Sequence, residues 1–236
     1  MQFTFYGDLL GIGSAYKLGA KTAYDKLNAF YNETFRTLAA FSDLPNNHIE
    51  MFSDSLLVIG DDASHAVIDI ALLFANLLRS GLLLRGAMVN GRLTYDARVT
   101  RPNFEKRLPE DDTLARAAGL EKSQKGARFL IEPALARGLL LAKPEWSTHE
   151  GYVQTIGLEG DDQLRRICPT PDSNSFEYLY YWTDEASFED YGRRIKDLKD
   201  VMVMYDKSIR EHFEETISVI DRTKHRHKMT TERLQQ

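Results

Sequence analysis

The sequence has little cysteine, no excess of positive charge and no long apolar run. Its single cysteine, Cys168, excludes an internal disulfide and a cysteine-rich metal centre. Its 30 lysines and arginines are outnumbered by 35 aspartates and glutamates, which gives a net charge of −5. General nucleic-acid binding needs a basic surface, so this balance argues against it. Hydrophobic residues still make up 43% of the 236 positions, enough for a packed core.

The apolar segments do not predict a membrane protein. The longest of them, such as 66–78, are interrupted by Asp69 and Asn76 and are too short to span a bilayer. The first residues, MQFTFYGD, lack the basic-then-apolar order of a signal peptide. A chain that needs no disulfide also fits a reducing compartment. We therefore expect a cytoplasmic protein with neither membrane nor nucleic acid as a partner.

Hydrophobic periodicity and turn signals predict a β-α-β-β-α-β order in the first 90 residues. This is the split βαβ, ferredoxin-like plan, which implies an α+β domain with a mostly antiparallel sheet and helices packed on one face. The expected strands are 3–7, two within 48–59 with a turn near Ser53, and 82–89, and the expected helices are 22–41 and 63–80.

The rest of the chain carries weaker signals. Asn90-Gly91 is typical of a hairpin turn into a further strand at 92–95. Two domains are expected, a main domain at 1–183 and a C-terminal helical extension at 184–236. The further elements are loops at 99–112 and 143–175, the second with weak strands, helices at 113–123 and 134–140, strands at 127–131 and 176–182, one long helix at 184–222 and a fraying tail from Arg222.

Two aspartates stand out because the split βαβ plan brings their strands together. Asp8 lies where the first strand ends, and Asp54 follows the turn between the second and third strands. Either residue alone is also typical of a turn. In this plan, however, the first and third strands are central neighbours, so both carboxylates can share hard cations. Gly11 and Gly13 follow Asp8, and they would let backbone N–H groups approach a triphosphate.

Four segments in this order resemble the class III nucleotidyl cyclases. Residues 6–11 (YGDLLG) are similar to that family's first metal motif, and residues 50–54 (EMFSD) to its hairpin motif with the second metal aspartate. Residues 84–91 (LRGAMVNG) resemble its Arg-x-Gly-x-x-x-Gly strand, and residues 114–121 (LARAAGLE) lie over its helical Val-Asn-x-Ala-x-Arg-Leu-Glu motif. The resemblance covers about residues 3–132.

The fourth segment departs from the family pattern. The family's asparagine falls on Ala115 and its transition-state arginine on Gly119, so these two roles are not carried over. Arg116, one helical turn before the lost arginine, is the preferred replacement cation, with Lys122 and Arg92 as other candidates. In this stretch and in its short length, the chain looks most like the bacterial pyrimidine cyclases of the Pycsar antiphage systems.

The resemblance implies a reaction and a set of site residues. A uridylate cyclase would convert UTP, or else CTP, to the 3′,5′-cyclic monophosphate and pyrophosphate with two Mn²⁺ or Mg²⁺ ions. The product would act as an antiphage second messenger on a separate effector. The catalytic residues would be Asp8, Asp54 and Arg116, the metal ligands Asp8, the Leu9 carbonyl and Asp54, and the nucleotide contacts Tyr6, Leu10, Gly11, Ile12, Gly13, Glu50 and Phe52.

The base preference and the activity itself have alternatives. Glu50 takes the position where adenylyl cyclases place a lysine, and a carboxylate accepts hydrogen bonds but donates none. It therefore disfavours adenine, whose N1 is an acceptor, while uracil, cytosine and guanine all offer donors. A guanylyl or adenylyl cyclase remains an alternative, as does a catalytically silent module that binds a nucleotide and signals by dimerising. The resemblance also implies a homodimer.

Overall fold

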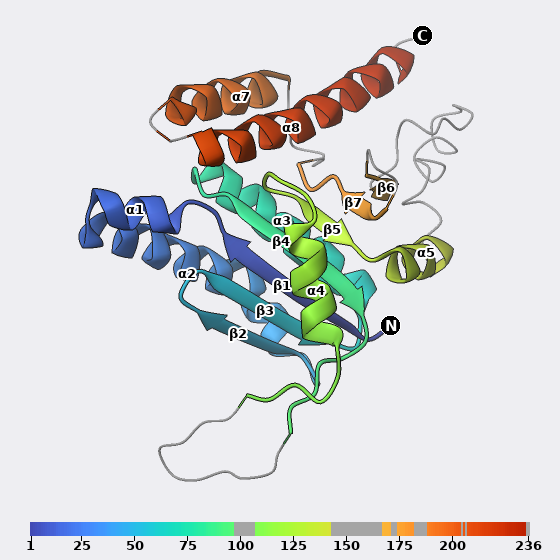
Figure 1. Cartoon of the computed structure of the whole chain (residues 1–236). Helices are drawn as coiled ribbons and strands as arrows, with labels where there is room; N and C mark the ends of the chain where they lie inside the picture. The colour runs from blue at the N-terminus through green and yellow to red at the C-terminus, as the bar shows by residue number, and fades with distance from the viewer. Residues whose placement is uncertain are drawn as a thin grey trace.

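The computed structural model describes residues 1–96, 107–142, 167–170, 174–181, 188–203, 205 and 207–234. Its strands form a single sheet with the order β2-β3-β1-β4-β5-β7-β6 (Figure 1). Of the strand pairs, β4–β5 is parallel and the others are antiparallel. The strands are β1 (Phe3–Leu9), β2 (His48–Phe52), β3 (Ser55–Gly60), β4 (Leu84–Asn90), β5 (Phe129–Ile131), β6 (Ile167–Pro169) and β7 (Phe176–Tyr178).

Helices cover this sheet, which confirms the predicted α+β class with a mostly antiparallel sheet. They are α1 (Ile12–Leu18), α2 (Ala20–Ser42), α3 (Ala63–Arg79), α4 (Thr113–Lys122), α5 (Pro133–Ala142), α7 (Phe188–Met202) and α8 (Lys207–Leu234). In the part of the chain that the structure describes, none of them is long and apolar enough to cross a membrane.

Side chains alternate along the central strands, and this alternation creates two different faces. Phe3, Phe5 and Leu9 of β1 belong to the main core with α2 and α3. Leu57 of β3 points to the other face, where a smaller cluster receives Leu114 from α4. Figure 1 shows α4 in front of the sheet, with α2 and α3 behind it. The expectation of helices on one face was therefore wrong, because α4 packs on the second face and buries apolar side chains there.

An aromatic cluster fixes the central strands against α3. The Phe5 ring meets Phe74 at 6.2 Å and Phe129 at 5.6 Å, both edge to face, a favourable geometry for aromatic pairs. The same ring lies over Gly86 of β4, where an added Cβ would come within 2.4 Å of it. The glycine of the Arg-x-Gly segment is therefore required by packing.

One short helix was not expected, and one expected strand is absent. Gly11 (φ 86°) starts α1, and Gly19 (φ 137°) separates it from α2, so a short helix precedes the one expected at 22–41. Residues 92–95 do not form a strand. Within this segment Tyr95 makes an isolated bridge with Pro109. The segments 97–106, 143–166 and 171–173, which carry most of the expected loops, lie outside the described residues.

The expected long helix at 184–222 is two helices. The first, α7, ends at Met202, and α8 runs from Lys207 to Leu234, through the tail that was expected to fray. They pack side by side over one end of the sheet (Figure 1). The chain folds back because α8 then buries Phe213 and Ile217 in the main core, which one continuous helix would not allow. The domain division at 183/184 stays a prediction.

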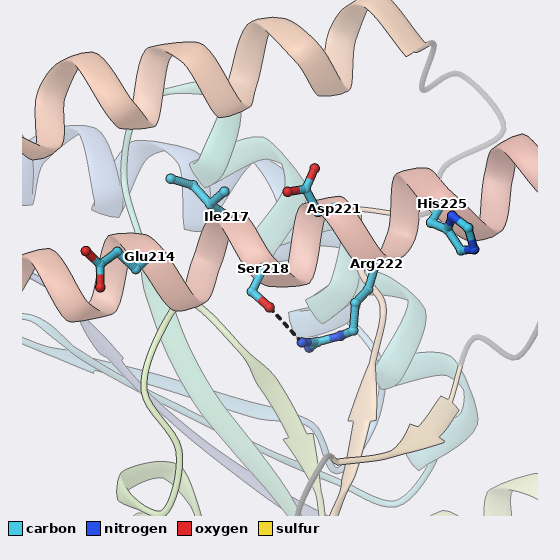
Figure 2. Close-up of a pocket in the computed structure, with 6 residues that line it drawn as sticks. All are labelled: Glu214, Ile217, Ser218, Asp221, Arg222 and His225. Atoms are coloured by element: carbon cyan, nitrogen blue, oxygen red, sulfur yellow. Dashed lines mark hydrogen bonds between the residues drawn. The ribbon is translucent and has the colours of Figure 1, made fainter.

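A buried ion network fixes α8 to the sheet. Arg128, next to β5, and Glu177 of β7 are 2% and 1% exposed and pair at 3.2 Å. Arg222 of α8 binds the same Glu177 oxygen at 3.0 Å, and Glu215 of α8 binds Arg128 at 2.7 Å. Figure 2 shows Arg222 with its second partner, Ser218, beside an open hollow along α8. No predicted site residue lines this hollow.

Candidate functional site

Asp8 and Asp54 come together where β1 meets the β2–β3 turn. Asp8 is paired with Ser55 in the β1–β3 register, and the Leu9 N–H donates to the Asp54 carbonyl at 2.8 Å. Ser53 and Asp54 form the turn between the paired residues Phe52 and Ser55, and Ser53 takes a positive φ of 55°. Both aspartate side chains are half-buried. The predicted proximity of the first and third strands is therefore present, and it puts the two carboxylates at neighbouring positions.

The electrostatic environment of Asp8 is unfavourable for its charge. Burial raises the pKa of Asp8 to about 6, and the charges of Asp54 and then Glu121 add to the increase. Arg85 and Lys122 oppose it. Two partly buried carboxylates repel each other, so a bound cation would offset this electrostatic repulsion.

Arg85 stands opposite Asp8 in the β1–β4 register, and its guanidinium is already bound. Its Nε donates to Oε1 of Glu121 on α4. Glu121 is fully buried, and burial raises its pKa while Arg85 opposes that change. Among the described residues, its second oxygen, Oε2, has no hydrogen-bond donor. No role was predicted for either residue, although Arg85 lies in the cyclase-like segment 84–91 and Glu121 in the segment 114–121.

One face of the sheet carries several of the predicted contacts. Residues paired across strands point to the same face, so Tyr6, Leu57 and Glu50 lie in a row. Asp8 lies two residues from Tyr6 on the same face. The Tyr6 hydroxyl and the Ser55 hydroxyl share a hydrogen bond of 3.2 Å. This face therefore leads from Asp8 across Tyr6 to Glu50.

Glu50 lies in a small charged cluster at the edge of the sheet. Its Oε2 lies 3.5 Å from His48 Nε2 and 3.5 Å from Arg107 Nη1, yet it accepts no hydrogen bond from the residues that the structure describes. The Arg107 guanidinium lies 5.5 Å from the Tyr95 ring centroid. Burial raises the pKa of Tyr95, and the Glu50 charge adds to that rise. Phe52, two residues on, is 81% exposed and free to meet a ligand.

The segment after Asp8 exposes its backbone. Leu10 donates its N–H to Leu83, and Ile12 is buried in the main core. At Gly11 and Gly13 an added Cβ would meet nothing within 4 Å, so the backbone is open there. Of the predicted nucleotide contacts in this segment, these two glycines can be approached directly, whereas Ile12 offers only its backbone.

Arg116 is not brought to Asp8. It binds Asp112 and Glu132, and it donates to the Asn90 carbonyl at 2.9 Å. Asn90 pairs with Phe3, five residues before Asp8 on β1. At about 3.3 Å per residue, Arg116 contacts the sheet roughly 17 Å from Asp8. In this chain the Arg116 guanidinium holds the start of α4 against β4.

Comparisons with known proteins give the fold. Neither the family models nor the curated proteins include a match to this sequence. Among solved structures, a bacterial light-regulated adenylyl cyclase matches with a TM-score of 0.50 at 11% identity, over 82% of this chain and 56% of that one. The adenylyl cyclase CyaB from P. aeruginosa matches at 0.48 and 15%, over 60% and 81%.

A guanylyl cyclase domain from the aquatic fungus Blastocladiella emersonii is similar to the same degree. Its TM-score is 0.48 at 12% identity, over 75% of this chain and 91% of that domain. At such identities the likeness concerns the fold alone. The chain has the α+β fold of nucleotidyl cyclase domains, and its activity has to be argued from its own residues.

Proposed function

We propose that this chain is a nucleotidyl cyclase. The ribose 3′-oxygen of a nucleoside triphosphate would attack the α-phosphorus, the bond to the β-phosphate oxygen would break, and the hydroxyl proton would pass to solvent. The observation that carries the proposal is the pair Asp8 and Asp54. They lie at neighbouring positions on β1 and the β2–β3 turn, and the open backbone of Gly11 and Gly13 at the start of α1 follows Asp8 directly.

The donor atoms fit two divalent ions such as Mg²⁺ or Mn²⁺. These ions prefer oxygen ligands and usually keep substrate phosphates and water in their shells. Asp8, Asp54 and the Leu9 carbonyl would be the protein ligands. In the described part of the chain no group of three or more aspartate, glutamate, histidine or cysteine residues is placed so that it could hold a metal ion, so substrate oxygens would complete the shells. Bound ions would lower the pKa of the 3′-hydroxyl and neutralise the triphosphate.

The other residues would position the substrate. The open backbone at Gly11 and Gly13 would donate to phosphate oxygens, with Leu10 and Ile12 shaping that loop. Tyr6 lies between the metal end and Glu50, so the ribose would lie over it. Positioning and charge stabilisation carry the rate in such displacements, because the protein does little covalent chemistry.

Glu50 and its neighbours would read the base. A carboxylate accepts from uracil N3–H, and the adjacent Arg107 guanidinium can donate to a base carbonyl. Together with the Pycsar resemblance, this supports UTP as the substrate and cyclic UMP as an antiphage messenger for a separate effector. The same pair would also accept guanine, so a guanylyl cyclase is the nearest alternative. Phe52 would stack on the base, and a homodimer would be the working form.

A silent nucleotide-binding module is the second candidate. Ala115 and Gly119 are exposed on α4 and have no group that can touch a phosphate. Such a module would bind a triphosphate tightly and release it unchanged. The choice between the two functions then depends on whether another cation serves the reaction.

The decisive experiment is a comparison of four substrates. Purified protein is incubated with UTP, CTP, GTP or ATP, each with Mn²⁺ or Mg²⁺, and cyclic monophosphate and pyrophosphate are quantified. Cyclic UMP above the other products supports the full proposal, and another cyclic product corrects only the base. Tight binding of a triphosphate without any product would contradict the cyclase function and favour the silent module.

A further inference from the structure

The side of α4 that points away from the sheet ends in Lys122, at the end of the candidate site that contains Asp8. Thr113, Ala117 and Glu121 of α4 are buried toward the sheet. Lys122, at the end of the helix, is exposed, as is Gly119 one turn before it. In a helix, residues three apart share a side. Nothing lies within 4 Å of a Cβ built at Gly119, so the space in front of this part of α4 is open.

The contacts at its two ends place α4 along β4. Arg116, near its start, binds the Asn90 carbonyl, and Glu121, near its end, binds Arg85. From Asn90 to Arg85 is about 17 Å of strand, whereas from 116 to 121 is about 8 Å of helix, and the long arginine side chains span the difference. The end of α4 therefore lies beside Arg85, the residue opposite Asp8.

Other cations near this face are held by carboxylates. Arg85 binds buried Glu121, Arg116 binds Asp112 and Glu132, and Lys125 binds Glu211 of α8. Arg92 binds Asp61 at 3.2 Å and the Asn46 carbonyl. Lys122 has no such contact within the described residues, and its charge acts on both Asp8 and Glu121. It is a point charge on a flexible four-carbon stem, suited to reach a phosphate.

We infer that Lys122 is a catalytic residue whose ammonium binds the triphosphate beside Asp8 and stabilises the negative charge that develops as the bond to pyrophosphate breaks. This inference rests on the proposed cyclase function. Lys122 would supply what Ala115 and Gly119 lack, and it replaces Arg116 as the cation of the reaction. Its ammonium donates hydrogen bonds and transfers no proton, so the reaction balances as written above.

The test compares Lys122→Ala and Lys122→Arg with the wild type in steady-state assays with the best substrate and Mn²⁺. Removal of one charge-stabilising donor costs about 10²–10³-fold in kcat, so we expect Lys122→Ala to lose about a hundredfold in kcat. Its KM for the triphosphate should change far less. Lys122→Arg keeps a cation and should be at least about tenfold faster than Lys122→Ala. The control is Lys21→Ala, which removes an exposed lysine on α2 and should leave kcat unchanged.

The outcomes separate the two proposals. If the wild type turns over and Lys122→Ala keeps its kcat within about threefold, the inference about Lys122 is wrong and the cyclase function stands. A rise in KM with unchanged kcat would also overturn it. The lysine would then bind the substrate and the transition state equally, without stabilising the transition state further. If the wild type makes no cyclic product with any triphosphate, the proposed function itself fails. Matching thermal unfolding of all variants confirms that a lost rate is not lost folding.

Discussion

Arg85 faces Asp8 across the β1–β4 pair, yet the Arg85 guanidinium binds Glu121. The buried Glu121 accepts the Arg85 hydrogen bond, and the Arg85 charge still lowers the pKa of Asp8. Burial, and then the like charges of Asp54 and Glu121, raise the pKa of Asp8 to about 6 although Arg85 and Lys122 oppose the rise. We therefore expect the ionised Asp8 carboxylate to lower the free energy of unfolding at neutral pH when no cation is bound.

Asp8→Asn should stabilise the metal-free protein at neutral pH. The folded pKa of Asp8, about 6, lies above its ordinary value of 3.8, so the folded state holds the proton more tightly. The stability that this proton provides is complete below about pH 4 and is lost as pH rises through 6. A shift of about two units corresponds to at most about 3 kcal/mol. In urea unfolding with a chelator present, the variant should have a higher free energy of unfolding than the wild type at about pH 7.5. The two values should be equal near pH 4. Equal pH profiles would contradict the prediction.

Asp54→Ala should abolish turnover without loss of folding. Asp54 lies in a turn and is half-buried, so its removal costs little packing. The displacement would lose a metal ligand, and we expect activity below about 1% of wild type. Production of the cyclic nucleotide is the measurement. Asp25→Ala, which removes an exposed carboxylate on α2, is the matched control and should keep full activity. An active Asp54→Ala would contradict the metal assignment.

Glu50→Gln should weaken the choice between bases. The amide keeps the shape of the side chain but loses the charge next to Arg107. Hydrogen bonds to charged groups contribute about 1.5–3 kcal/mol, so kcat/KM for the preferred triphosphate should fall at least about tenfold relative to ATP. Competition between the two substrates in one reaction measures the ratio directly. An unchanged ratio would mean that Glu50 does not face the base.

Gly119→Ala should stabilise the protein, whereas Gly86→Ala should destabilise it. A Cβ at Gly119 meets nothing within 4 Å and adds helix propensity, for a gain of about 0.5–1 kcal/mol. A Cβ at Gly86 would come within 2.4 Å of the Phe5 ring, and such overpacking costs about 1–3 kcal/mol. The midpoints of denaturant unfolding for both variants test the pair. A stabilising effect at Gly86 would contradict the described packing.

Glu177→Ala should cost more stability than any surface charge. It leaves the guanidinium of Arg128, 2% exposed, with its other carboxylate partner on α8 only. Removal of one partner from a buried ion pair costs about 3–5 kcal/mol. Glu214→Ala, which removes an exposed carboxylate on α8, should change the free energy of unfolding by less than about 0.5 kcal/mol. A mild effect at Glu177 would mean that water enters the network.

The sequence predicted most of the elements because their signals are local. Apolar residues repeat along α2 and α3, and β1, β3 and β4 are short, largely apolar runs next to turns. The errors lie where long-range packing decides. The break between α7 and α8 depends on burial of Phe213 and Ile217 against the distant sheet. The strand expected at 92–95 lacks a neighbouring strand to pair with, since β4 already pairs with β1 and β5.

The candidate site divides in the same way. The sequence alone predicted that Asp8 of β1 lies next to the β2–β3 turn that holds Asp54, because element order and the antiparallel plan fix which strands pair. The nucleotide contacts at Tyr6, Glu50 and Phe52 remain predictions. Only the tertiary structure decided which cation accompanies the pair. Arg116 and Lys122 are six residues apart on one helix, but α4 lies along β4, so one contacts the far end of the sheet and the other lies near Asp8. Such a difference depends on the docking of a helix, which no local pattern contains.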